Sequence, residues 1–150
     1  MKCKHVIFVG LLGVLLACNL PQRSHEKIYA AMFGKPGDSC VEMLQSRDAI
    51  ALDDGMIYIH FKACPNEVKR ILALVPYKFE GMSTSSMKIE SIDTTANDAD
   101  MIPYRPNWWR LNSLGDSCLK YEYIHKDEDR AQVLFISIDS TEVFYKDLVW

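Results

Sequence analysis

Cys18 is the residue of this chain whose chemistry is most clearly indicated, because it directly follows a long apolar run. Lys2 and Lys4 make the N-terminus positive, and residues 6–17 contain no polar side chain. This order of positive charge, apolar run and small residue is typical of a secretory signal that is removed after export. The run is too short to span a bilayer, since a transmembrane helix needs about 20 apolar residues. The sequence therefore predicts a signal peptide over residues 1–17.

The end of this segment, Leu15-Leu16-Ala17-Cys18, resembles the lipobox of bacterial lipoproteins. The resemblance implies that the thiol of Cys18 is diacylglycerylated and that signal peptidase II cuts just before it. Several acyl chains on one residue suffice for stable attachment to a bilayer. Asn19 follows in place of an aspartate, which by resemblance to the sorting signal of enteric bacteria favours the outer membrane, with the domain facing the periplasm. The alternative is an ordinary signal peptide with an incidental cysteine.

Three cysteines remain once Cys3 is removed with the signal and Cys18 is acylated, namely Cys40, Cys64 and Cys118. An odd number in an exported protein allows at most one disulfide and leaves one thiol. None of them lies in a CxxC pair, so neither a thioredoxin-like site nor a zinc knuckle is indicated. We expect Cys40 and Cys64 to form the disulfide, because both lie toward the open end of a predicted hairpin, with Cys118 free.

Two identical Gly-Asp-Ser-Cys tetrapeptides, at 37–40 and 115–118, resemble the nucleophile block of the GDSL hydrolases. That chemistry needs a histidine to activate the serine and an acid to orient the histidine. The family carries these two as Asp-x-x-His near the C-terminus, and this chain has no such tetrapeptide. His60 and Cys64 are four apart, but zinc needs three or four convergent ligands. We therefore expect no catalytic residue, metal or cofactor, and a small hydrolase is the third and least favoured function.

Trp108 and Trp109, with Tyr104 shortly before them, are the remaining candidates for a binding site. Neighbouring residues of an extended segment point to opposite faces, so one indole can enter the core while the other stays outside. An exposed indole together with Tyr104 could form an aromatic platform for a sugar or a partner protein. The favoured interpretation is structural, because large aromatic side chains dominate core burial. The tryptophan pair would then hold the C-terminal strands to the rest of the domain.

Two short helices are predicted by their caps and apolar spacing. Ser24 is suited to cap the first helix, which Gly34 would end, and Pro65 is suited to the first position of a second helix, which Pro76 would close. Between them, residues 41–63 predict a β-hairpin.

The dipeptide Asp54-Gly55 indicates a two-residue turn for this hairpin. In that register Cys64 lies opposite Gln45, and Cys40 lies about 16 Å further along a straight strand. A disulfide between them therefore requires a bulge or bend near Ser46.

The C-terminal third contains three strand-like runs, Cys118–His125, Ala131–Ile138 and Thr141–Val149, joined by short polar turns. Connections this short predict an antiparallel meander. The stretch 77–107 predicts little beyond a possible strand over Met87–Ile92. The predicted fold class is α+β: an antiparallel sheet, formed by an N-terminal hairpin and a C-terminal three-stranded meander, with two short helices packed on it. Residues 18–23 would be a lipidated tether and 24–150 a single domain.

The chain has 17 basic and 20 acidic residues, and removal of the signal leaves 15 and 20. This balance argues against nucleic-acid binding, which needs clustered lysine and arginine. The arrangement also resembles uncharacterised small bacterial lipoproteins, in which a hairpin strand ending in phenylalanine precedes a short helix and a Trp-Trp segment. In those proteins an Asp-containing turn then precedes an aromatic strand, matched here by Asp139, Phe144 and Tyr145.

This resemblance implies a fold and assigns no activity. The main hypothesis is a membrane-tethered, non-catalytic domain that binds another protein or an envelope component. The alternative is an immunity lipoprotein that neutralises a toxin delivered to the periplasm.

Overall fold

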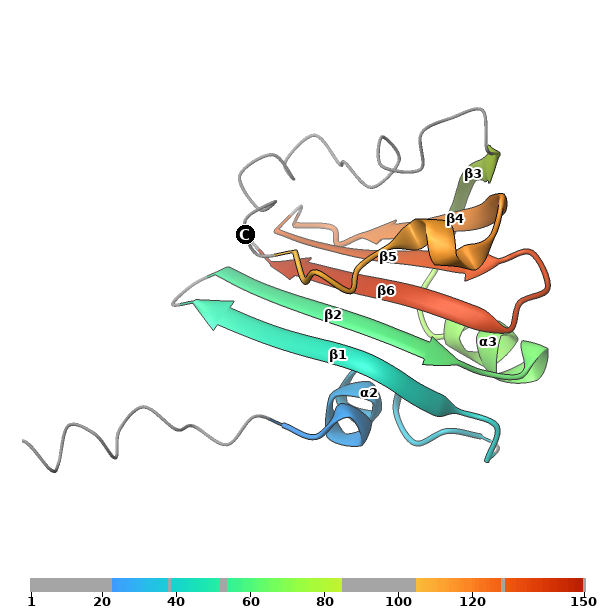
Figure 1. Cartoon of the computed structure of the whole chain (residues 1–150). Helices are drawn as coiled ribbons and strands as arrows, with labels where there is room; N and C mark the ends of the chain where they lie inside the picture. The colour runs from blue at the N-terminus through green and yellow to red at the C-terminus, as the bar shows by residue number, and fades with distance from the viewer. Residues whose placement is uncertain (1–22, 38, 52–53, 85–104, 128, 150) are drawn as a thin grey trace, which may run out of the picture.

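The computed structural model describes residues 23–37, 39–51, 54–84, 105–127 and 129–149, which form a six-stranded antiparallel sheet with two helices on one face (Figure 1). This confirms the predicted α+β class. The strand order is β1-β2-β6-β5-β4-β3. The elements along the chain are α2 (His25–Phe33), β1 (Glu42–Ala51), β2 (Asp54–Lys62), α3 (Pro65–Leu72), β3 (Lys78–Thr84), the 3-10 helix η2 (Leu111–Leu114), β4 (Ser117–Ile124), β5 (Arg130–Ser137) and β6 (Glu142–Val149).

Several sequence predictions lie outside the described residues. These are the signal peptide over 1–17, the tether up to residue 22 with Cys18, the strand over Met87–Ile92, and Tyr104. Within the described ranges, no helix has the length and apolar character needed to cross a membrane.

Both helices begin at the residues that the sequence predicts. The Ser24 hydroxyl accepts a hydrogen bond from the Lys27 amide at 3.4 Å, and Gly34 ends α2 with a φ of 75°. Pro65 occupies the first turn of α3, where its missing amide hydrogen costs nothing. Helix α3 ends at Leu72, earlier than the apolar spacing suggests. The residue before a proline avoids the helical region, so the chain leaves the helix ahead of Pro76.

The β1–β2 hairpin forms, but the predicted turn at Asp54-Gly55 is wrong. Ala51 pairs with Asp54, and Gly55 pairs with Ile50 on one side and with Val149 on the other. Gly55 is therefore a strand residue, and its φ is not in the positive range. The register differs from the predicted one by an even number of residues, which keeps every side chain on the same face. The apolar pattern consequently could not distinguish the two registers.

A bulge between Met43 and Gln45 shifts the pairing at the open end of the hairpin, so that Glu42 pairs with Lys62. It lies slightly before the expected position near Ser46. The predicted placement of Cys64 opposite Gln45 is wrong, because Gln45 pairs with His60.

The C-terminal strands β4, β5 and β6 are neighbours in that order and form the predicted meander. Pairing of β2 with β6, from Gly55–Val149 to Lys62–Glu142, joins the hairpin to the meander. The sequence did not predict β3. This edge strand pairs with β4 and carries a bulge between Phe79 and Gly81.

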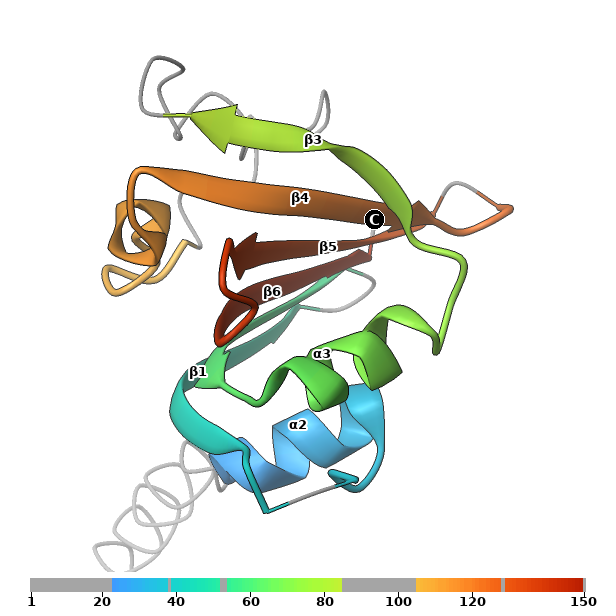
Figure 2. The same ribbon diagram turned by 90° about the vertical axis from the view of Figure 1, so that its right-hand side faces the viewer.

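The sheet has an apolar core on each face. Helices α2 and α3 cover one face, and the segment containing Trp109 and η2 lies on the opposite side (Figure 2). Strand β2 serves both cores, because Ile59 and Phe61 face the helices whereas Met56 and Tyr58 face the tryptophan. The buried residues of the helix side include Ile28, Tyr29, Phe33, Val68, Ile71, Leu134, Ile136, Val143 and Tyr145. Those of the tryptophan side include Leu111, Leu114, Cys118, Val133, Phe135, Phe144 and Leu148.

Candidate functional site

The two tryptophans occupy different environments. Trp109 is 5% exposed, and its ring lies 4.8 Å from Tyr58 and 5.1 Å from Phe144, both nearly edge-on. Trp108 is half-buried, with its ring nearly parallel to the imidazole of His60 at 6.4 Å. Trp109 is thus a core residue, and Trp108 is the one that reaches the surface. Tyr104, the third member of the predicted platform, lies outside the described residues.

His60 on β2 lies between Trp108 and two residues of β6, Phe144 and Glu142. Its imidazole stacks on the Phe144 ring at 3.9 Å, and its Nε2 is 2.7 Å from Glu142 Oε1. Register explains both contacts, because His60 pairs with Phe144, and Glu142 precedes Phe144 by two residues and so lies on the same face of β6. The ring is therefore fixed by stacking on one side and by a carboxylate at its edge.

Glu142 also lines an open cleft of about 520 Å³ at the β5–β6 turn and the start of β4. Asp139 in this turn accepts hydrogen bonds from the Ser137 hydroxyl at 2.6 Å and the Thr141 hydroxyl at 2.7 Å. These bonds hold the pKa of Asp139 below its ordinary value, with Ser137 as the main cause. The Ser137 oxygen also accepts from the Thr141 and Glu142 amides. These hydrogen bonds pair the polar groups of the turn with one another and so stabilise the turn. The remaining lining residues are Leu114, Asp116, Ser117 and Ile138.

The serines of the two Gly-Asp-Ser-Cys repeats lie in different places. Ser39 is exposed in the turn before β1, whereas Ser117 begins β4 and lines the cleft. The cysteines that follow them also differ. Cys40 forms a disulfide with Cys64, and Cys118 is a fully buried thiol in the tryptophan-side core. Burial raises the pKa of Cys118, which keeps it in the unreactive thiol form.

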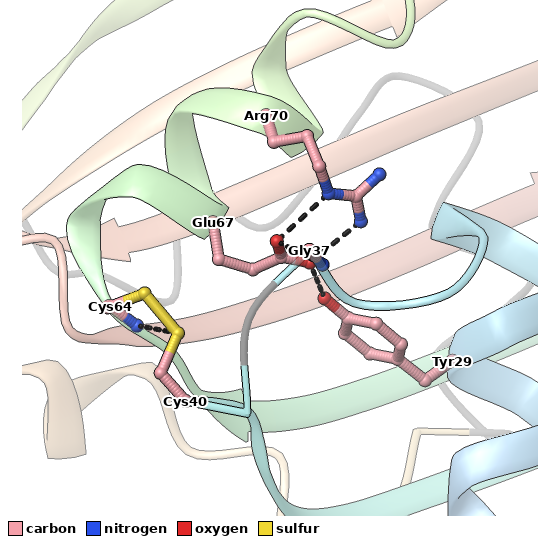
Figure 3. The surroundings of a disulfide bond; sticks show 6 residues. All are labelled: Tyr29, Gly37, Cys40, Cys64, Glu67 and Arg70. Carbon is pink, nitrogen blue, oxygen red and sulfur yellow. Dashed lines mark hydrogen bonds and ion pairs between the residues drawn. A yellow bond between two sulfur atoms is a disulfide. The ribbon is translucent and has the colours of Figure 1, made fainter.

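The disulfide adjoins a buried ion-pair cluster that joins both helices (Figure 3). The Cα atoms of Cys40 and Cys64 are 5.7 Å apart. Nearby, the carboxylate of Glu67 is almost fully buried and accepts hydrogen bonds from the Tyr29 hydroxyl at 2.7 Å and the Gly37 amide at 3.1 Å. Arg70 donates to both of its oxygens, at 2.7 and 2.9 Å.

These contacts shift the acidity of the cluster in opposite directions. The hydrogen bonds from Arg70 lower the pKa of Glu67 to about 2, against the effect of burial. Burial, followed by the bond to Glu67, raises the pKa of Tyr29. Every oxygen of the carboxylate is engaged, so the cluster is a structural connection between α2, the following loop and α3. Across the described residues, no three His, Cys, Asp or Glu side chains converge as a metal site would need.

An apolar surface lies at the other edge of the sheet, on strands β3 and β4. Phe79 is 56% exposed and Met82 is 54% exposed. They pair with Tyr121 and Leu119, and the rings of Phe79 and Tyr121 are 5.3 Å apart. We refer to these four residues as the β3–β4 surface. Leu119 and Tyr121 are half-buried and pack against the helix-side core, so Phe79 and Met82 form the exposed part of this surface.

The chain is an α+β domain with an apolar core on each face of its sheet and an apolar surface at one sheet edge. These features alone do not indicate a particular reaction or ligand. No known family model matches the chain, and comparisons with curated proteins and with solved structures gave no match.

Sequence reasoning identified Trp108 and Trp109 but did not identify the β3–β4 surface. The signal that could have found it is the alternation in Lys78-Phe79-Glu80, since a large apolar residue between two charged ones is typical of an exposed strand. The loop-like composition of the following stretch obscured this pattern. The alternation of the strand predicts that His60 lies on the face opposite Ile59, but it does not predict the contacts of His60 with Trp108 and Glu142, which join residues far apart in sequence.

Proposed function

We propose that the chain is a lipid-anchored protein of the cell envelope, whose domain binds another protein or an envelope component and catalyses no reaction. The lipobox supports the anchor, through acyl chains on Cys18. The observation that carries the binding role is the β3–β4 surface, where Phe79 and Met82 are each more than half exposed. Large apolar side chains that are exposed together mark interaction surfaces on soluble domains.

The length of the tether supports this assignment. Residues 18–23 can extend at most about 20 Å, at roughly 3.5 Å per residue. The domain begins beside β1, where Arg23 pairs with Asp48 at 3.4 Å and His25 lies 2.6 Å from the Ser46 hydroxyl. Strand β3 lies five strand spacings away, about 24 Å at roughly 4.8 Å each. The anchor would hold the β1 edge near the bilayer and direct the β3–β4 surface toward the periplasm.

The anchor is tested by the variant Cys18→Ser. We expect an uncleaved precursor that no longer incorporates labelled palmitate, whereas the wild-type chain is labelled and processed. Unchanged labelling of Cys18→Ser would contradict the proposed attachment.

The binding role is tested by a photo-crosslinking amino acid placed at Phe79 of the full-length chain in intact cells. Gln45 on β1 is the matched control, because it is also exposed on an edge strand, but β1 is the opposite edge of the sheet from β3. We expect a discrete adduct from position 79 and none from position 45. Equal yields from both positions would contradict a role for the β3–β4 surface.

An immunity function is the second candidate, and the cleft is the observation that favours it. Asp116, Asp139 and Glu142 line the cleft and would complement a basic surface on a toxin. The test is survival of cells exposed to a toxin encoded next to the gene of this chain. Protection that is lost on charge reversal at Asp116 would support this function, and survival without the chain would exclude it.

A further inference from the structure

The helix layer is positively charged, although the chain as a whole is acidic. We define this layer as residues 23–37 and 63–77, which contain α2 and α3 and cover one face of the sheet (Figure 2). Its charged side chains are two acidic and five basic ones: Glu26, Glu67, Arg23, Lys27, Lys35, Lys69 and Arg70. The whole chain has a net charge of −3. The charge of the helix layer therefore has the opposite sign to that of the protein.

Two of the five basic side chains have carboxylate partners within the domain. Arg70 pairs with the buried Glu67 at 2.7 Å, and Arg23 pairs with Asp48 of β1 at 3.4 Å. The remaining three are lysines. Glu26 is the other acid of the layer and can offset one of them. The lysines therefore carry the excess positive charge.

These three residues, Lys27, Lys35 and Lys69, are exposed on the outer surface of the layer. Lys27 and Lys69 point away from the sheet, because a turn of 100° per residue places each of them opposite the buried side of its helix. Lys35 follows the end of α2. Arg70 donates to the Phe33 carbonyl at 2.9 Å and so joins α3 to that end of α2. The three lysines thus belong to one surface.

The proposed lipid anchor leads directly into this surface. Residues 18–23 reach at most about 20 Å from the bilayer, at roughly 3.5 Å per residue. Helix α2 begins two residues after Arg23 and has nine residues, about 14 Å at 1.5 Å per residue. It lies beside β1, where His25 is 2.6 Å from the Ser46 hydroxyl. An anchor on Cys18 therefore brings the outer side of α2 within reach of the membrane.

We infer that Lys27, Lys35 and Lys69 bind the headgroups of anionic lipids, so that the domain rests on the membrane through its helix layer. This inference rests on the proposed function, because the acyl chains on Cys18 bring the lysines to the bilayer. Each lysine close to an anionic bilayer strengthens binding roughly fivefold, and the attraction falls off over about 10 Å at 0.1 M salt.

This contact also orients the domain. Helix α2 and strand β3 lie at opposite ends of the molecule (Figures 1 and 2). With α2 on the bilayer, the β3–β4 surface lies on the side away from the membrane, which is the orientation that the tether supports. The lipid contact therefore leaves that surface accessible to a partner.

The test uses the full-length, acylated chain in vesicles of phosphatidylcholine, either alone or with an equal amount of phosphatidylglycerol. Ala31→Cys introduces an accessible thiol on the exposed side of α2 and leaves the buried Cys118 and the Cys40–Cys64 disulfide in place. A fluorophore on this thiol is quenched by spin-labelled lipid headgroups when α2 contacts the bilayer. We expect strong quenching only with phosphatidylglycerol. Phe79→Cys on β3 is the control and should be quenched weakly in both kinds of vesicle.

Charge removal tests the three lysines themselves. The triple variant Lys27→Gln, Lys35→Gln and Lys69→Gln should lower the ratio of bound to unbound domains on the order of a hundredfold and abolish quenching at position 31. About 1 M salt, which shortens the screening length to about 3 Å, should act likewise. Urea melts check that each variant keeps its fold. The matched control removes the same charge from exposed residues outside the layer and should keep the quenching: Lys78→Gln, Arg110→Gln and Lys126→Gln.

The outcomes separate this inference from the proposed function. A chain that does not float with the vesicles would overturn the anchor and the inference together. A chain that floats but is quenched equally at position 31 with and without phosphatidylglycerol would overturn the inference and leave the anchor intact. Equal loss of quenching in the triple variant and its matched control would overturn the role of the three lysines. Stronger quenching at position 79 than at position 31 would overturn both the lipid contact and the proposed orientation.

Discussion

At the scale of single residues, Glu67 connects three parts of the fold through its carboxylate. Its carboxylate receives hydrogen bonds from α2, from the loop after it and from Arg70 on its own helix. Arg70 also donates to the Phe33 carbonyl at 2.9 Å, at the end of α2. A buried carboxylate in this position requires all its partners, because removal of one member leaves the others buried and unsatisfied.

Glu67→Gln should therefore lower the free energy of unfolding at pH 7 by on the order of 3 kcal/mol. The amide keeps the size of the side chain, but it loses the charge and one acceptor that Arg70 uses. Glu26→Gln is a suitable control, because Glu26 lies exposed in the first turn of α2. Urea melts of both variants measure the difference, and equal midpoints would contradict the structural role of Glu67.

The same residue predicts a pH dependence. The pKa of Glu67 is lowered in the folded state to about 2 from an ordinary 4.5. Its contribution to stability is then fully present above about pH 4.5 and is lost as the pH falls toward 2. Urea midpoints recorded between pH 5 and pH 2 should fall more steeply for the wild-type chain than for Glu67→Gln. Parallel curves would indicate that the carboxylate has its ordinary pKa in the folded protein.

The neighbouring tryptophans provide a second residue-scale prediction. Trp109→Ala removes a ring that is 5% exposed and packed against Tyr58 and Phe144, so we expect a loss of about 3–5 kcal/mol. Trp108→Ala removes a half-buried ring that stacks on His60 and should cost clearly less. Urea melts of the two single variants measure this order. A larger loss for Trp108→Ala would mean that the two indoles have exchanged roles.

At the scale of elements, the hairpin register depends on whether Gly55 is a turn or a strand residue. In the structure it pairs with Val149, and a methyl group added to it would meet only the Val149 Cβ at an ordinary 4.0 Å. Gly55→Ala should therefore change the free energy of unfolding by less than about 1 kcal/mol, with the sign favouring the variant.

Gly34→Ala is the matched control, because Gly34 ends α2 with a φ of 75°. An alanine there is strained by about 1–3 kcal/mol, because its φ of 75° and ψ of −172° lie in a region that only glycine adopts readily, although no atom crowds it. Thermal or urea melts compare the two variants. Destabilisation of Gly55→Ala by as much as Gly34→Ala would restore the turn predicted from Asp54-Gly55.

These elements also show which features a sequence can predict. Caps and alternation are local, and they located both helix starts, the hairpin and the meander. Register, the pairing of β2 with β6 and the contact of His60 with Glu142 depend on residues far apart along the chain. Strand β3 was missed because its residues precede a polar stretch and make few buried contacts. The same exposure makes it the candidate binding edge.

At the scale of the whole molecule, one sheet supports two cores. Strands β2, β5 and β6 bury side chains on both faces, so disruption of one face removes support from the other. A partly buried salt bridge also connects the strands on the helix side, where Arg130 donates to Asp147 through Nε at 2.8 Å. The domain should consequently unfold as one cooperative unit.

The Cys40–Cys64 disulfide tests this cooperativity from one end of the sheet. It joins the loop before β1 to the start of α3 and closes a segment with a sequence separation of 24. Its loss in the double variant Cys40→Ala with Cys64→Ala should cost about 3 kcal/mol, because the unfolded chain gains freedom. Dithiothreitol should lower the urea midpoint of the wild-type chain equally and leave the double variant unchanged.

Two spectroscopic signals report this change at different places. Far-UV circular dichroism follows the helices beside the disulfide, and tryptophan fluorescence includes the buried Trp109 on the opposite face. If the shared strands couple the two cores, both signals should shift to the same lower urea concentration in the double variant. A fluorescence midpoint that stays in place while the dichroism midpoint falls would contradict a single cooperative unit. It would instead show that the tryptophan-side core unfolds independently of the helices.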